Sequence, residues 1–187
     1  MKPLLPLLAL LLASATGCGD DGNDRAGAGA ETVGDYGADL RQLNGSGVNG
    51  EAEFELGEDV LVVRITATGV QSDRVLAQYI KGFTASARAR CPDDSGRAGR
   101  IVDRREGRSA YGRTVFAVEP FPTIGPQEDT LRYDLKLPLS EAERRRIEPL
   151  ESRVLVLAGG TADIDGDGSA RYLRNLPVAC GEIRASD

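Results

Sequence analysis

The stretch EAEFELGEDVLVVRITAT, residues 51–68, decides the fold class. Its first part alternates glutamate with an apolar residue, so that Ala52, Phe54 and Leu56 share one face of an extended chain. A Gly-Glu-Asp sequence at residues 57–59 is suited to a turn, and the alternation resumes after it. Alternation with a period of two is typical of strands with one buried face. We therefore predict a half-buried antiparallel hairpin.

Further strands are expected along the chain. Residues 131–137 alternate in the same way, residues 153–157 form a short apolar run, and residues 178–183 are the expected last strand. Ser140 and Glu143 form a capping box, which predicts one helical turn over residues 140–147. Short strands separated by turn signals favour an all-β fold, either a sandwich or a Greek-key barrel. The strand pattern does not distinguish these two folds.

The chain has 187 residues with a hydrophobic fraction of 41%, which suits one ordinary domain. We expect a signal peptide at residues 1–17, a lipidated N-terminus and flexible tether at 18–34, and the folded domain at 35–187. The tether is rich in Gly, Asp and Ala and lacks apolar periodicity. The sequence contains no His, so it lacks the commonest ligand of zinc and copper.

The N-terminal segment ends at Cys18. A basic Lys2 and an apolar run at residues 4–12 are followed by small residues at 15–17, as in a signal peptide. A Cys directly after such a site resembles the bacterial lipobox, although a plain secretory peptide with an incidental Cys is the alternative. Acylation of Cys18 would leave an even number of the three cysteines. We expect an exported protein of the bacterial cell envelope, held at the membrane surface by this lipid anchor.

A family resemblance centres on residues 76–82, LAQYIKG. This stretch resembles the strand His-x-Gln-His-Ile-His-Gly of bacterial CHRD-like domains, which are relatives of the copper/zinc superoxide dismutase sandwich. Gln78, Ile80 and Gly82 match the pattern. The three histidines of the family are replaced here by Leu76, Tyr79 and Lys81.

Other blocks extend the resemblance. They are Cys91-Pro92, Glu106-Gly107, Tyr111-Gly112, residues 153–159, where Ala158 replaces a fourth histidine, and the ending LPVACG at residues 176–181. The resemblance implies a superoxide dismutase-like, Greek-key β-sandwich. It also brings the loop after the Tyr79 strand against the last strand, which predicts a Cys91–Cys180 disulfide in an oxidising compartment.

The resemblance implies that the metal site is lost. Neither Tyr79 nor Lys81 supplies a neutral nitrogen ligand at pH 7, and we expect a strand that only packs and faces solvent. The sequence also lacks a His to activate a Ser or Thr nucleophile. We therefore expect a pseudoenzyme with no cofactor. The alternative is a residual metal-binding or calcium-binding protein, or an enzyme of the same superfamily.

Two acidic stretches are candidates for calcium binding. Asp163, Asp165 and Asp167 occupy the first, third and fifth places of a calcium loop, but Arg174 stands at the twelfth. This stretch is expected to be a polar turn or, alternatively, a weak calcium site. A second calcium-like loop of the family retains only Asp103 and Glu106. Its other ligand positions are Ser95, Arg97 and Gly99, so we expect it to be incompetent for calcium.

Charge is unevenly distributed. The whole chain carries −6, and it carries −7 without residues 1–17, which contain one Lys. Residues 81–113 contain nine basic and four acidic residues, a net charge of +5, so the rest of the mature chain carries −12. This basic segment is either a solvated loop or a docking site for an anionic envelope polymer or lipid head group. Nucleic acid is not an expected partner. The candidate anion-binding residues are Arg104, Arg105 and Arg108.

Overall fold

A computed structural model describes residues 32–84, 87–93, 101–163 and 165–186. The expected signal peptide, Cys18, nearly all of the tether and the positions Ser95, Arg97 and Gly99 lie outside these ranges. The strands are β1 (Thr32–Gln42), β2 (Asn49–Gly57), β3 (Val60–Thr68), β4 (Ala77–Gly82), β5 (Arg113–Ala117), β6 (Thr130–Pro138), β7 (Val154–Ala162), β8 (Arg171–Glu182) and β9 (Arg184–Ala185). The helices are α1 (Arg104–Tyr111), α2 (Glu141–Ile147) and the 3-10 turn η1 (Leu150–Ser152).

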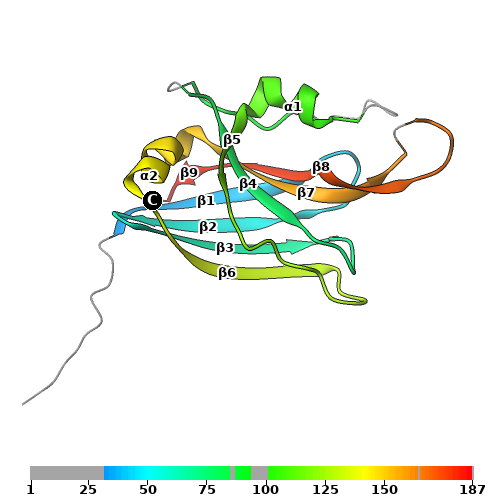
Figure 1. Cartoon of the computed structure of the whole chain (residues 1–187), viewed down its shortest axis with the longest axis horizontal. Helices are drawn as coiled ribbons and strands as arrows, with labels where there is room; N and C mark the ends of the chain where they lie inside the picture. The colour runs from blue at the N-terminus through cyan, green and yellow to red at the C-terminus, as the bar shows by residue number, and fades with distance from the viewer. Residues whose placement is uncertain (1–31, 85–86, 94–100, 164, 187) are drawn as a thin grey trace, which may run out of the picture.

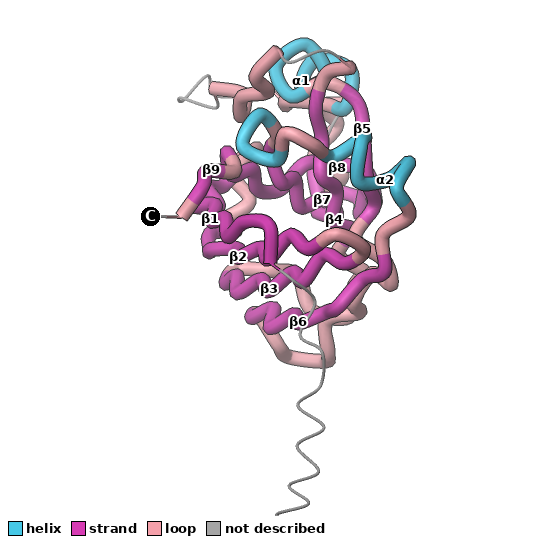
Figure 2. The backbone as a smooth tube through the Cα atoms, turned by 90° about the vertical axis from the view of Figure 1, so that its left-hand side faces the viewer, coloured by secondary structure: helices cyan, strands magenta, loops and turns pink. Residues whose placement is uncertain are grey.

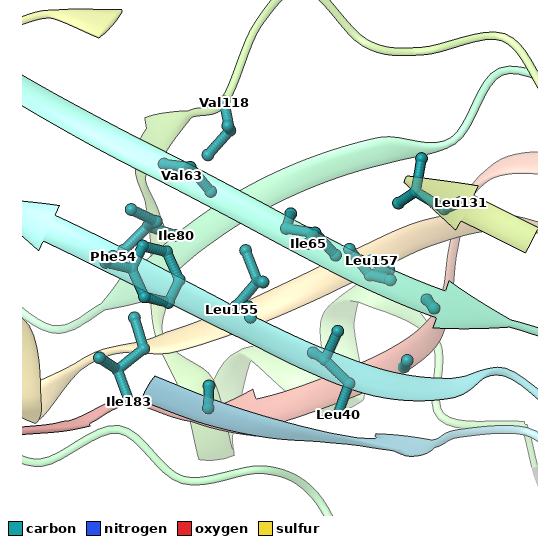
Figure 3. Close-up of a cluster of buried hydrophobic side chains, with 14 of the residues drawn as sticks. Leu40, Phe54, Val63, Ile65, Ile80, Val118, Leu131, Leu155, Leu157 and Ile183 are labelled. Carbon is teal, nitrogen blue, oxygen red and sulfur yellow. The ribbon is translucent and has the colours of Figure 1, made fainter. Parts of the chain in front are cut away.

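The strands form one curled antiparallel sheet in the order β5-β4-β7-β8-β1-β2-β3-β6, and β9 pairs with β1 (Figures 1 and 2). The predicted all-β sandwich or barrel class is confirmed. Curling brings the β5-β4-β7-β8 half over the β1-β2-β3-β6 half, and side chains from both halves form the main core between them (Figure 3). Burial of each large apolar side chain in that core contributes about 1.5–3 kcal/mol.

The predicted hairpin is confirmed as β2 and β3. Its register pairs Ala52 with Ile65 and Phe54 with Val63, and these four side chains are buried. Their neighbours along the strands face outward, where the half-buried Arg64 forms a salt bridge with Glu55. The alternating pattern therefore assigns the two faces of this hairpin correctly, because a period of two leaves no other register that buries the apolar face.

The other expected elements are partly right. The capping box is confirmed, since Ser140 Oγ accepts from Glu143 N and the Glu143 side chain accepts from Ser140 N. The expectation of a last strand at residues 178–183 is wrong in its bounds, because β8 begins at Arg171 and β9 follows it. Strand β1 begins at Thr32, three residues before the expected domain start at 35. Helix α1 was not expected from the sequence.

The connection between β4 and β5 covers the outer face of the sheet, opposite the main core. Val154 and Val156 of β7 point outward and form a second apolar cluster with Ala89 and Tyr111 of this connection. The predicted disulfide joins Cys91 in the connection to Cys180 in β8, with a Cα–Cα distance of 5.7 Å. In Figure 1, α1 accordingly lies above β7 and β8. The parts of the basic segment that the structure describes therefore include residues packed onto the sheet, such as Ala89 and Tyr111.

Gln78 is a polar residue inside the main core. It pairs in register with Leu157, its side chain is 0% exposed, and its amide has no hydrogen-bond partner in the part of the chain that the structure describes. An unpaired buried amide costs about 1–3 kcal/mol. We expect Gln78→Leu to increase the free energy of unfolding by about 1–2 kcal/mol in urea denaturation. The exposed Gln71→Leu, as a control, should give no gain, and a loss in Gln78→Leu would contradict this account.

Candidate functional site

A pocket of about 290 Å³ lies on the outer face of the sheet, where β4, β7 and β8 meet the end of α1. We call it the basic pocket. Strand β4 contributes Tyr79 and Lys81, and the corner between α1 and β5 contributes Arg108, Tyr111, Gly112, Arg113 and Thr114. The floor and far wall consist of Val156, Ala158, Asn175 and Pro177 from β7 and β8. A site of this size suits a small group rather than a large ligand.

Lys81 is the buried cation of this pocket. Its side chain projects from the outer face of β4 and the residue is only 7% exposed. Nζ donates to Thr114 Oγ1 at 3.0 Å, because Lys81 and Thr114 are register partners on β4 and β5. The ammonium also lies 5.1 Å from each of the ring centroids of Tyr79 and Tyr111, whose faces attract a cation. The expectation that this strand face is solvated is therefore wrong at Lys81.

Two glycines bring α1 against β4. A Cβ at Gly107 would lie 2.2 Å from the hydroxyl oxygen of Tyr111, so only glycine lets that ring fold back over the helix. Gly112 has φ +75°, and a Cβ there would lie 2.2 Å from the carbonyl oxygen of Gly82. The Glu-Gly and Tyr-Gly pairs thus have a packing role. They position the Tyr111 ring beside Lys81.

Asp103 caps the N-terminus of α1 and thereby helps to position the basic residues of that helix. Its Oδ1 accepts from the backbone N–H groups of Arg105 and Glu106, both at 2.7 Å, which is an N-cap. The spacing Asp-x-x-Glu, which the family resemblance interprets as a calcium-loop remnant, is also a sequence signal for the start of this helix. Of the predicted anion-binding residues, Arg108 lines the basic pocket. Arg105 is exposed on α1 outside the lining, and the side chain of Arg104 lies outside the described part.

The lining of the basic pocket is positively charged. Lys81, Arg108 and Arg113 contribute three cations, and none of the described residues that line the pocket is an Asp or Glu. A concave wall of one charge sign concentrates the field and attracts counter-ions. Arginine adds a planar fork of donors that matches phosphate and carboxylate oxygens. The arrangement is therefore suited to an anion.

The four positions that the CHRD-like resemblance aligns with histidines fall in two places. Tyr79, Lys81 and Ala158 line the basic pocket together, whereas Leu76 belongs to the main core. The structure therefore brings three of these four positions to one site. No group of three or more His, Cys, Asp or Glu side chains that could hold a metal ion occurs within residues 32–84, 87–93, 101–163 and 165–186.

The acidic loop at residues 163–168 uses its carboxylates locally. Asp163 accepts from the backbone N–H groups of Gly166 and Gly168, both at 2.8 Å, and these bonds, chiefly that from Gly168, lower the pKa of its carboxyl. Asp165 lies 3.3 Å from Arg171, and Asp167 accepts from the Ser169 N–H. These contacts are those of a polar turn between β7 and β8.

Arg113, Thr114 and Asn175 were missed as site residues. Arg113 belongs to the basic segment and could have been included on charge alone, whereas nothing in the sequence singles out Asn175.

Comparison with protein-family models and with curated proteins gives no match for this chain. None of the helices in the described ranges is long and apolar enough to cross a membrane.

Proposed function

We propose that this protein is a non-catalytic, lipid-anchored module of the bacterial cell envelope that binds an anionic envelope component in the basic pocket. The observation that carries the proposal is the set of Lys81, Arg108 and Arg113 around one pocket whose described lining contains no acid. A cation held almost out of solvent interacts more strongly with an anion than a solvated one does. The ligand group is a phosphate or carboxylate.

The sequence supports the location and the absence of catalysis. Acylation of Cys18 would hold the domain at the membrane surface through the tether at residues 18–34. The CHRD-like resemblance describes a dismutase-related sandwich whose metal ligands are replaced, and three of those positions line the basic pocket. The alternative, a residual metal-binding or calcium-binding protein, has weaker support because the carboxylate of Asp163 accepts backbone N–H groups of its own loop.

Reversing two pocket charges tests the proposal. We expect the double variant Arg108→Glu/Arg113→Glu to lose low-salt retention both on polyphosphate resin and on phosphatidylglycerol vesicles. Each basic residue near an anionic surface contributes about 1 kcal/mol, so retention should fall at least ~30-fold. Both residues are exposed, so the fold should persist, which circular dichroism checks.

A matched control separates a site from net charge. Arg132→Glu/Lys136→Glu makes the same charge change at exposed positions of β6, in the other half of the sheet. This variant should be retained almost as well as the wild type. An equal loss in both double variants would show that only net charge matters. If neither polyphosphate resin nor phosphatidylglycerol vesicles retain the wild type in a salt-sensitive way, the proposal is wrong.

A further inference from the structure

A second pocket adjoins the basic pocket. It has a volume of about 470 Å³ and lies between β5 and α2, and we call it the α2 pocket. Arg113 and Thr114, at the start of β5, line both pockets and so form a shared wall. Arg145 and Arg146, from the last turn of α2, also line the α2 pocket. Basic side chains thus continue from α1 across β5 to α2.

The arginines of α2 are available to a ligand. Arg145 pairs with Glu141 and Arg146 lies 3.9 Å from Glu143, both within one helix turn and with arginine side chains more than half exposed. Such exposed pairs contribute little and exchange readily for a better partner. Glu148 also lines the α2 pocket, and its carboxylate accepts a hydrogen bond from Arg144 at 3.0 Å.

We propose that the two pockets together recognise a linear polyanion with repeated phosphate groups, rather than one lipid head group. This inference rests on the proposed function. The basic pocket takes one phosphate at Lys81 and Arg108, Arg113 contacts the chain at the shared wall, and Arg145 and Arg146 hold a later phosphate.

The divided site favours a polymer over a membrane lipid. The head group of a lipid reaches one pocket while its acyl chains stay in the bilayer, so the second pair of arginines gains no ligand. A polymer that fills the first pocket presents its next charges to the second at high effective concentration, which raises its affinity without any new kind of contact.

Calorimetric titration of the purified protein with inorganic phosphate, tripolyphosphate and long-chain polyphosphate at fixed salt tests the inference. We expect the affinity per molecule to rise at least ~30-fold from phosphate to polyphosphate, because the second pocket binds at high effective concentration. Arg145→Gln/Arg146→Gln should remove most of this gain and leave intact the phosphate site at Lys81 and Arg108 in the basic pocket. Arg113→Gln should weaken both, and the control Arg132→Gln/Lys136→Gln, which removes the same charge from β6, should keep the gain.

The other outcomes separate the inference from the proposed function. If polyphosphate binds and Arg145→Gln/Arg146→Gln loses no more affinity than the control, the ligand stops at the basic pocket and the inference is overturned. Tighter binding to phosphatidylglycerol vesicles than to polyphosphate, through Lys81 and Arg108, would identify a head group as ligand and also overturn it. If no anion binds the wild type, the inference and the proposed function fail together.

Discussion

Replacing Arg153 with methionine should destabilise the fold by about 3–5 kcal/mol, a large part of the 5–15 kcal/mol that holds a typical domain folded. Arg153 lies between η1 and β7, directly before the first residue of the strand, and it is only 4% exposed. Its guanidinium donates to the carbonyl oxygens of Ile147 and Glu148 at 3.0 and 2.8 Å, and to that of Arg146 at 3.3 Å. These are the carbonyls that the end of α2 leaves without helical partners.

The same side chain also fixes the end of β4. Arg153 Nη1 donates to the carbonyl oxygen of Phe83 at 3.0 Å, and the side chain passes so close to Gly82 that a Cβ there would lie 2.4 Å from Arg153 Cδ. Burial lowers the pKa of the guanidinium, which nevertheless stays charged at neutral pH. Methionine keeps the apolar stem but leaves four carbonyl oxygens without this donor.

Urea denaturation of the wild type and two variants measures the effect. Arg153→Lys keeps the charge but not the planar fork, so it should fall between the wild type and Arg153→Met. The exposed Arg132→Met is the control and should change stability by less than about 0.5 kcal/mol. A loss below about 1 kcal/mol in Arg153→Met would contradict the role assigned to these hydrogen bonds.

The parts of the fold that were predictable are those set by local patterns. Residues 51–68 specify both strands and their buried faces, because a one-residue slip would expose Phe54 and Val63. Ser140 and Glu143 specify the start of α2 through bonds three residues apart. The bounds of β8 were not predictable, because its first residues, RYLRN, show no alternation of apolar and polar positions although Tyr172 and Leu173 pair with β7.

The candidate site was predictable only in part, because tertiary packing creates it. The charge of residues 81–113 identified the basic segment, and Arg108 within it, but not that Lys81 would lie under Tyr111. That burial requires α1 to fold back over β4, which depends on contacts such as Gly112 against Gly82. Asn175 enters the pocket from β8, far along the chain. The arginines of α2 were likewise outside the predicted segment.

Removing the disulfide should have the other large effect. The Cys91–Cys180 bond closes a loop of 89 residues, and the chain-entropy model then gives about 4–5 kcal/mol of stabilisation, an upper value. The bond fastens the connection that covers Val154 and Val156, and other contacts also join this connection to the rest of the fold. One such contact is the hydrogen bond from Ala89 N to Ser152 O, at 3.0 Å. Loss of the bond should therefore also loosen this cover.

The double variant Cys91→Ala/Cys180→Ala measures this contribution through its urea midpoint, and dithiothreitol applied to the wild type should reproduce most of the shift. The single variant Cys18→Ser is the control and should keep the wild-type midpoint, because the predicted lipidation site takes no part in the bond. If the double variant unfolds at the wild-type midpoint, the covering connection is held by its packing alone. The basic pocket would then keep its anion affinity under reducing conditions, whereas a stabilising disulfide predicts that reduction weakens both stability and binding.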